Sequence, residues 1–302
     1  MHKANNFDVI IVGGSYAGLA AAMSLGRSLR SVLIIDSGKP CNRQTPHSHN
    51  FLTQDGKTPK EISEIAKSQV LAYKTVTFVD DKAISGFKKE GIFSIGTQMG
   101  ATYTSGKLVF ATGIKDLMPS IKGFAECWGI SVVHCPYCHG YEIRNEKTGI
   151  IANGERAYHL APMVNNLTKD IRILSNGPAS FSTEQSSKLK THNIDILEKK
   201  IVEVVHDNGQ VKNVVFDDGS KENYTALYAA LPFDQHSDIP VSLGCELSDE
   251  GYIQVDSMYK TTIEGVYACG DNCIKMRSLA NSVASGTMVG AVINMELVKE
   301  KF

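Results

Sequence analysis

The chain of 302 residues is 42% hydrophobic, and its 31 Lys and Arg almost balance its 32 Asp and Glu. This length predicts about two domains, and the composition is that of an ordinary globular protein rather than a disordered or fibrous one. Because the net charge is near zero and like charges form no long block, nucleic acid and anionic membranes are not expected partners. The first apolar stretch, Val9–Val12, is too short for a signal peptide or a membrane span, so we expect a cytoplasmic protein.

The first part of the chain predicts a strand–turn–helix–strand unit. Its elements are, in chain order, a buried strand at Phe7–Val12, a glycine turn, a helix from Ala17 to about Arg27 and a strand at Ser31–Asp36. Residues 83–105 then alternate in short segments with turn signals between them, which predicts β-hairpins. A strand at Lys107–Phe110 follows and runs into Ala111-Thr112-Gly113.

The same order recurs later in the chain. The corresponding segments are strands at Thr148–Ile151 and Ile171–Leu174, hairpins within 202–230 and an apolar run at Leu227–Ala230. A strand and a long helix within 265–302 would return to the first unit. We therefore predict an α/β fold of two Rossmann-like dinucleotide-binding units, of three-layer ββα type, with the second inserted within the first. The first domain is expected to comprise residues 1–115 and 246–302, and the central domain residues 116–245.

The turn Gly13-Gly14-Ser15-Tyr16-Ala17-Gly18 predicts a dinucleotide site. Gly13 allows a sharp exit from the strand, Gly18 lets the helix lie close to the sheet, and the helix N-terminus presents free N–H groups to a pyrophosphate. Ser15 stands where a glycine usually lets the backbone approach the phosphates, and its hydroxyl could donate to a phosphate oxygen. Asp36 ends the second strand, where a carboxylate would accept a hydrogen bond from a ribose hydroxyl. The alternative is that these glycines serve packing only.

The segment Val266-Tyr267-Ala268-Cys269-Gly270-Asp271 predicts a second contact to the cofactor. A strand that ends in Gly-Asp puts a carboxylate at the carboxyl edge of the sheet, where such folds bind ligands. The helix that begins near Leu279 has small residues at Ala280, Ala284 and Gly286, which would let a flat ring system approach. Its positive N-terminus would favour an anionic reduced flavin. FAD is therefore the expected cofactor, and no metal is expected.

The segment His134-Cys135-Pro136-Tyr137-Cys138-His139-Gly140 predicts a redox-active cysteine pair. Two cysteines three residues apart at a helix start can place both sulfurs on one side of a turn, within the geometry of a disulfide. Pro136 suits the first helical position, and the helix N-terminus would stabilise a thiolate at Cys135, the candidate for exchange with a substrate. Cys138, one turn inward, would face the flavin, and His139 could act as the local acid or base.

Other interpretations of this segment stay open. C-x-x-C-H is also the attachment signature of c-type haem, although we recognise no export signal. A zinc site of two His and two Cys would be unusual because the chain has a single C-x-x-C, and a purely structural pair is a further alternative. His134 and His139 could each be packing residues. The other five cysteines are expected to be buried small residues.

The segments GGSYAGLAAA, FATG, HCPYCHGYE and YACGD together resemble the low-molecular-weight thioredoxin-reductase-like flavoproteins over nearly the whole chain. HCPYCHGYE is more similar to the branch that includes dithiol oxidases than to ordinary thioredoxin reductases, which usually carry an acid where this chain has His139. The resemblance implies that Cys138 is the flavin-proximal sulfur, that Cys135 exchanges with substrate and that the protein is a homodimer.

The same resemblance indicates the extent of the cofactor site. It implies that Asp271 contacts the ribityl chain and that the loop with Asn42 and His49 lies near the flavin, the alternative being that these loop residues are solvated. The expected cofactor-binding residues are Gly13, Gly14, Ser15, Tyr16, Ala17, Gly18, Asp36, Ser37, Asn42, His49, Ala111, Thr112, Gly113, Gly270, Asp271 and Ser278.

The second unit departs from the pattern of a nucleotide site. Its turn reads Ala152-Asn153-Gly154-Glu155-Arg156-Ala157, with Ala152 in place of the turn glycine and Glu155 bringing negative charge to where phosphates would lie. After the next strand, Ser175-Asn176-Gly177 offers neither an acid for a ribose hydroxyl nor arginines for a 2′-phosphate, and Pro232 stands where a glycine is expected. NADPH binding is therefore in doubt, and the central domain is either a relic or the site of another ligand.

These features predict an FAD-dependent dithiol/disulfide oxidoreductase that passes electron pairs between the flavin and the Cys135/Cys138 disulfide without conventional use of NADPH. The expected partner is a thioredoxin-like protein or a small-molecule dithiol or disulfide. Two alternatives are an NADPH-dependent thioredoxin reductase and a non-catalytic flavin-binding redox sensor. The potentials of the couples set the direction of electron flow.

Overall fold

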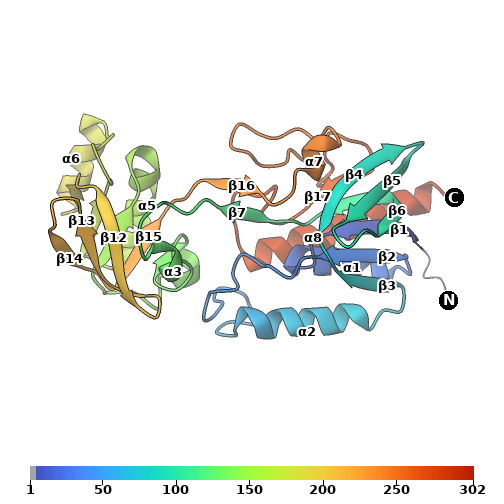
Figure 1. Ribbon diagram of the computed structural model, residues 1–302, viewed down its shortest axis with the longest axis horizontal. Helices are drawn as coiled ribbons and strands as arrows, with labels where there is room; N and C mark the ends of the chain where they lie inside the picture. The colour runs from blue at the N-terminus through green and yellow to red at the C-terminus, as the bar shows by residue number, and fades with distance from the viewer. Residues whose placement is uncertain (1–4) are drawn as a thin grey trace.

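The computed structural model describes residues 5–302 as two lobes joined by two extended segments (Figure 1). The connecting segments are β7 (Ile114–Asp116) and β16 (Phe233–Gln235), which pair antiparallel with each other. The N- and C-terminal parts of the chain both lie in the same lobe (Figure 1). The central part of the sequence is therefore inserted into the first lobe, and two antiparallel strands carry the chain out and back.

The first lobe is built on a seven-stranded sheet with β3-β2-β1-β6-β5-β4 in order and β17 paired to β6. Its elements are β1 (Asn6–Val12), α1 (Tyr16–Arg27), β2 (Val32–Asp36), α2 (Pro59–Leu71), β3 (Val76–Asp80), β4 (Ala83–Lys89), β5 (Ile92–Thr97), β6 (Thr102–Phe110), β17 (Val266–Ala268) and α8 (Leu279–Lys299). The first half of β6 pairs antiparallel with β5, and its second half pairs parallel with β17. One long strand thus joins a hairpin layer to the parallel sheet.

Alternating residues of β1 supply two separate cores. Val9 and Ile11 face α1 and α8, whereas Ile10 and Val12 face Phe93 and the other residues of the hairpin layer. Successive side chains of a strand point to opposite faces of the sheet, so both sets are buried only when each face is covered by its own layer. The first lobe is consequently a helix–sheet–hairpin sandwich, the predicted ββα arrangement.

The central lobe repeats this architecture on a five-stranded parallel sheet with the order β11-β10-β9-β15-β8. Its elements are α3 (Phe124–Cys127), β8 (Val132–Val133), α4 (Pro136–His139), β9 (Thr148–Ile151), α5 (Gly154–Leu167), β10 (Ile171–Leu174), α6 (Thr183–Thr191), β11 (Asp195–Leu197), β12 (Ile201–Asp207), β13 (Gln210–Phe216), β14 (Lys221–Asn223) and β15 (Ala226–Ala229). The strands β12, β13 and β14 form a separate antiparallel layer. The predicted α/β fold of two Rossmann-like units is confirmed.

Two features of the fold differ from the sequence predictions. Helix α2 and strand β3 were not among the predicted elements, although Thr58 and Glu61 form a capping box at the start of α2. The chain also returns to the first lobe earlier than residue 246. In the short helix α7 (Ile239–Ser242), Ile239 packs in the first-lobe core together with Cys245, because Gly86 of β4 leaves room for its side chain.

The close contact of α1 with α8 depends on glycine. A Cβ atom on Gly286 would lie 2.1 Å from the backbone oxygen of Ala17, so any side chain there would push the two helices apart. Gly286 was predicted to let a ring system approach; it lets another helix approach instead, and Ala280 and Ala284 are exposed. Within residues 5–302, none of the helices combines the length and apolar character needed to cross a membrane.

We expect Gly286→Ala to lower the free energy of unfolding by about 1–3 kcal/mol, because overpacking outweighs the gain of up to about 1 kcal/mol in helix propensity. Urea unfolding followed by circular dichroism measures this change. Gly106→Ala in β6 is the matched control, since its Cβ would meet its nearest neighbour at 3.9 Å. Equal stability of the two variants would show that the helix contact can relax.

Candidate functional site

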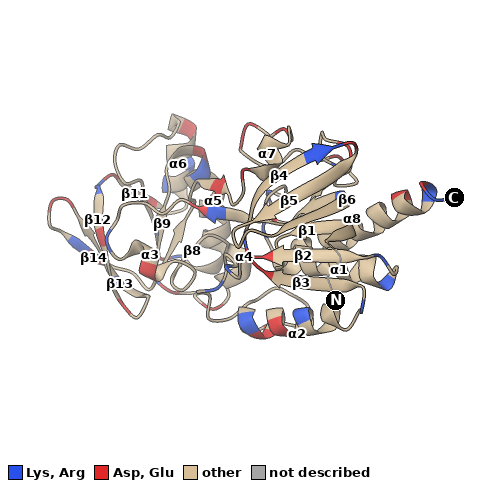
Figure 2. Cartoon of the chain, turned by 45° about the vertical axis from the view of Figure 1, so that its right-hand side comes forward, with Lys and Arg blue, Asp and Glu red and all other residues tan. Residues whose placement is uncertain are grey.

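A cavity of about 1190 Å³ lies where the carboxyl ends of the first-lobe strands meet the redox turn of the central lobe. The acidic ends of β2 and β3, red in Figure 2, are Asp36 and Asp80, and both line it. Every predicted cofactor-binding residue except Gly18 lines this cavity, as do Cys138 and His139, whereas Cys135 does not. Residues separated by more than 200 positions in the sequence thus face one space.

The glycine turn between β1 and α1 has the shape that its sequence predicts. Gly13 has φ +106°, and a Cβ there would lie 2.3 Å from the backbone oxygen of Ala111. Gly18 does not line the cavity because it packs against the backbone of Gly13, as expected of the third glycine of such a turn. The Gly14 N–H donates to Asp36 Oδ1 at 2.9 Å, so the acid at the end of β2 also orients the turn.

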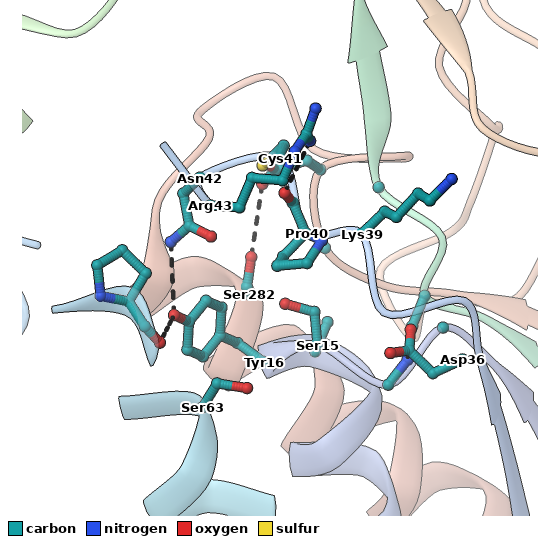
Figure 3. Close-up of a pocket in the computed structure, with 18 of the residues that line it drawn as sticks. Ser15, Tyr16, Asp36, Lys39, Pro40, Cys41, Asn42, Arg43, Ser63 and Ser282 are labelled. Carbon is teal, nitrogen blue, oxygen red and sulfur yellow. Dashed lines mark hydrogen bonds between the residues drawn. The ribbon is translucent and has the colours of Figure 1, made fainter. Parts of the chain in front are cut away.

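The N-terminus of α1 is left free for an anion. Ser15 is the N-cap residue, but its side chain makes no capping hydrogen bond. In Figure 3, Ser15 lies between Tyr16 and Asp36. The first N–H groups of a helix lack intrahelical partners and attract phosphate groups. The Gly13-Gly14 turn, the uncapped N–H groups of α1 and the nearby Asp36 carboxylate together fit the adenosine pyrophosphate part of FAD.

Tyr16 and Asn42 hold the loop after β2 against α1. The Tyr16 hydroxyl donates to the backbone oxygen of Pro59 at 3.1 Å and accepts from Asn42 Nδ2 at 3.4 Å (Figure 3). Both polar groups are therefore engaged in shaping the cavity wall. Cys41, expected to be buried, is exposed and also lines the cavity.

A largely buried ion cluster lines the cavity. Arg277 donates to both carboxylate oxygens of Asp116, at 2.8 and 3.2 Å, and its Nε lies 3.7 Å from Asp271 Oδ2. Burial raises the pKa of Asp271, and the charge of Arg277 opposes this shift. Ser282 of α8 also donates to Asp271. At the predicted Gly270-Asp271 contact, the carboxylate of Asp271 thus lies on the cavity wall. Its partner Arg277 was not predicted from the sequence.

The redox turn presents its two sulfurs unequally. Cys135 is the N-cap of α4 and Cys138 lies within it, and their Sγ atoms are 2.9 Å apart. The hydrogen bond from the Cys138 thiol lowers the pKa of Cys135 to about 7, and the backbone N–H groups of Cys138 and Tyr137 act in the same direction. The same contact, with burial, raises the pKa of Cys138. Helix α4 is only a single turn. The Cys135 thiolate, which we expected a helix N-terminus to stabilise, is stabilised by the Cys138 thiol and by these two backbone N–H groups.

Histidines line the cavity together with Cys138 of this turn. Five of the nine histidines line the cavity, namely His47, His49, His134, His139 and His236. Burial lowers the pKa of His134 to about 3 and also lowers the pKa of His139, so both rings are neutral near pH 7. Both ring nitrogens of His139 are buried without a hydrogen-bond partner in the described part of the chain. The central-lobe residue Glu142 reaches across to His49 of the first lobe at 3.7 Å.

The corresponding helix end in the central lobe is closed. Asn153 is the N-cap of α5, and its Oδ1 accepts from the N–H groups of Gly154 and Ser180, both at 2.8 Å. Its Nδ2 donates to the backbone oxygen of Pro178 at 2.8 Å, which draws the loop after β10 over the helix end. Glu155 is hydrogen-bonded to Gln185 of α6. A dinucleotide pyrophosphate would need the space and the N–H groups that these contacts use.

Several residues of the site carried no sequence signal that we used. Asp116 follows the FATG segment by three positions, and Arg277 directly precedes Ser278. Glu142 is the last residue of HCPYCHGYE, but the sequence analysis gave it no role. Phe78 of β3 lines the cavity and lies 2.7 Å from where a Cβ of Gly14 would be, which explains that glycine. Among residues 5–302, no group of three or more His, Cys, Asp or Glu is arranged to hold a metal ion.

Comparisons with known proteins agree with this architecture. Residues 7–286 match the pyridine nucleotide-disulphide oxidoreductase family. Thioredoxin reductase tcpT of Claviceps purpurea is 33% identical, over 99% of this chain and 97% of the relative. Thioredoxin reductase aclD of Aspergillus oryzae is 30% identical, over 96% of both chains. The crystal structure of an oxidoreductase from Agrobacterium tumefaciens superposes with a TM-score of 0.91 at 36% identity, over 97% of this chain and 99% of that one.

The family match extends over most of the chain, and it implies the FAD for which the first-lobe cavity has the required turn and carboxylates. The chain therefore belongs to the pyridine nucleotide-disulphide oxidoreductase family, as a flavin disulfide oxidoreductase of the low-molecular-weight, thioredoxin-reductase-like type.

Proposed function

We propose that the protein exchanges electron pairs between FAD in the first-lobe cavity and the Cys135/Cys138 pair, which in turn exchanges with a dithiol or disulfide substrate. One observation carries this proposal: Cys138 lines the cavity while Cys135, its partner at 2.9 Å, does not. The pair therefore has one sulfur on the cofactor side and one on the side away from it. When bound, FAD supplies a two-electron acceptor or donor.

The residues around the pair would divide the chemistry between them. Cys135, with its pKa lowered to about 7 by the Cys138 thiol, forms the mixed disulfide with substrate. Cys138 closes or opens the intramolecular disulfide. His139 is neutral, and its ring nitrogens have no hydrogen-bond partner among residues 5–302, so its unprotonated nitrogen takes the proton of Cys138 or returns it. Asp271, Arg277 and the turn from Gly13 to Ala17 orient the cofactor.

We further propose that NADPH is not the conventional electron donor. The support is the N-terminus of α5, where Asn153 occupies the first N–H group, that of Gly154, and holds the loop after β10 in place. The carboxylate of Glu155 adds negative charge there. Because relatives are named thioredoxin reductase, the second candidate function is an NADPH-dependent reduction of thioredoxin. A dithiol oxidase fits the first proposal, with a small-molecule dithiol as donor and oxygen or a protein as acceptor.

Substitution of the two cysteines tests the exchange mechanism. We expect Cys135→Ser and Cys138→Ser each to lower turnover of a dithiol or disulfide substrate by more than about 100-fold, because the pair acts as a unit. In wild type, the exchange rate should rise with pH through about 7, where the Cys135 thiolate forms, and then level off. The control is Cys245→Ser, a buried cysteine of the first-lobe core. Full activity of either site variant would exclude these roles, and absence of turnover in wild type would favour the redox sensor.

Anaerobic mixing with NADPH tests the electron donor. We expect less than about 10% of the flavin absorbance near 450 nm to bleach within seconds at 1 mM NADPH, while a small dithiol bleaches it fully. The reason is that the pyrophosphate would have to displace Asn153. Asn153→Gly, which opens the helix end, is the matched variant. Rapid stoichiometric bleaching of wild type, with turnover on thioredoxin, would establish the NADPH-dependent reductase instead.

We also propose that the protein is a homodimer in the cytoplasm. Helix α8 carries an exposed apolar stripe with alternating spacings of four and three residues, namely Ala284, Met288, Ala291, Met295 and Val298. A stripe of this period is the pattern of a helix that packs against a partner.

Charged substitutions on the stripe test the dimer. We expect the double substitution Met288→Glu and Met295→Glu to weaken self-association by at least about 100-fold, because it buries charge in an apolar interface. Analytical ultracentrifugation measures the association. Leu71→Glu, at the exposed end of α2, is the control. A wild-type monomer at all concentrations, or a dimer that the double variant leaves intact, would disprove this interface.

A further inference from the structure

A buried phenol beneath the redox turn has no assigned role. Tyr228 of β15 is 1% exposed, and its hydroxyl has no hydrogen-bond partner in residues 5–302. The described chain has three other buried tyrosines. Tyr16 donates to the backbone oxygen of Pro59, Tyr224 donates to Glu222, and Tyr267 donates to Glu296. A buried hydroxyl without a partner is costly, so the exception at Tyr228 requires a reason.

The position of Tyr228 follows from the sheet. β15 pairs parallel with β8, with Tyr228 opposite Val133, and both side chains lie in the core under α5. Strand β8 leads within two residues to Cys135. The Tyr228 hydroxyl lies 3.0 Å from where a Cβ of Gly140 would be, and the backbone oxygen of Pro136 lies 2.4 Å from the same point. The phenol therefore reaches the end of α4 at Gly140, and Tyr228 does not line the cavity.

The absence of a side chain at Gly140 is part of this arrangement. A Cβ there would lie 2.3 Å from Leu167 Cδ1, so a larger residue would lift the redox turn off the central lobe. The turn instead rests directly on α5 and on the Tyr228 hydroxyl. Burial raises the pKa of Tyr228, and Cys135, Glu142 and Cys138 raise it further, in that order. The hydroxyl consequently keeps its proton at neutral pH and faces a site where negative charge develops.

We propose that Tyr228 is a hydrogen-bond donor reserved for the Cys135 thiolate. It comes into use when Cys138 is not available as a donor. This inference rests on the exchange reaction proposed above and adds a residue to it. In the reduced pair, the Cys138 thiol donates to Cys135 at 2.9 Å. When Cys138 has lost its proton, that donor is gone, whereas the Tyr228 hydroxyl is still without a partner among residues 5–302.

The step at which this matters is the release of Cys135 from substrate. A second substrate thiolate attacks the substrate sulfur that is bound to Cys135, and a substrate disulfide forms. The bond between that sulfur and Cys135 Sγ breaks, and its electron pair stays on Cys135 as a thiolate. Tyr228 keeps its proton and donates a hydrogen bond to this leaving group. A thiolate that is stabilised in this way leaves faster and has a lower pKa.

The test uses Tyr228→Phe, which removes the hydroxyl and keeps the ring. Tyr224→Phe is the matched control, because it removes a buried hydroxyl of the same lobe that is bonded to Glu222. Both substitutions are made in wild type and in the Cys138→Ala background, where Cys138 cannot donate. The measured quantity is the rate of Cys135 alkylation by iodoacetamide from pH 5.5 to 10, resolved from the other cysteines by peptide mass spectrometry.

In the Cys138→Ala background we expect Tyr228→Phe to raise the apparent pKa of Cys135 by about one unit, and so to slow alkylation at pH 7 several-fold, with the difference lost above about pH 9. The shift should be smaller with Cys138 present, and Tyr224→Phe should leave the profile unchanged while lowering the melting temperature. The other charged groups that shape the baseline profile are Arg277 and Asp271, which act on the cysteine pair, and Glu142, which acts on Tyr228. The neighbouring imidazoles of His134 and His139 are neutral near pH 7.

Superimposable pH profiles for Tyr228→Phe and its parent in both backgrounds would overturn the inference, as would an equal shift in Tyr224→Phe. A higher melting temperature for Tyr228→Phe without a change in profile would identify the hydroxyl as an uncompensated buried group. These readouts do not depend on flavin turnover. Failure of the exchange reaction itself would appear in wild type, as a Cys135/Cys138 pair that never cycles with a substrate, and is thereby distinguished from failure at Tyr228.

Discussion

The site depends on the way the connecting strands hold the redox turn against the cavity. β7 and β16 pair over three residues, and Asp116 at the end of β7 is held by two hydrogen bonds from Arg277. Removing one partner of such a buried pair typically costs about 3–5 kcal/mol, because the other charge stays buried without compensation. The ion pair therefore fixes the connecting strand to the loop before α8. Asp271 and Cys138, which come from different lobes, line one cavity as a result.

A hydrogen bond gives the two sulfurs different pKa values, and burial keeps the surrounding imidazoles neutral. One hydrogen bond lowers the pKa of Cys135 and raises that of Cys138, so the reduced pair shares one proton near neutral pH. Burial also keeps His134 and His139 uncharged. A neutral imidazole beside a thiol can take a proton, which a charged one cannot do. Asp271, Asp116 and Arg277, by contrast, place charged groups on the wall of the same cavity.

The two lobes show how one architecture can keep or lose a binding site. Helix α1 follows β1, and helix α5 follows β9. Both helices begin at the carboxyl ends of parallel strands. The N-terminus of α1 has no side-chain cap, whereas the N-terminus of α5 is capped by Asn153 and covered by the loop that carries Pro178. This difference in capping is independent of the sheet and of the core, because an N-cap side chain contacts only the first turn of its helix. A few residues at one helix end are sufficient to close a dinucleotide site.

The sequence by itself determined the features that short-range physics controls. Recurrence of the first unit's order predicted the strands at Thr148–Ile151 and Ile171–Leu174 with the observed bounds. The glycine turn and the C-x-x-C spacing indicated where the chemistry lies. Helix α2 was missed although its capping box is a local signal, so that failure was one of interpretation. Only the tertiary structure paired Asp116 with Arg277, placed Glu142 beside His49 and put the Tyr228 hydroxyl next to Gly140. Such contacts join residues far apart in the chain, and which of them meet depends on how strands cross between lobes and how closely helices pack.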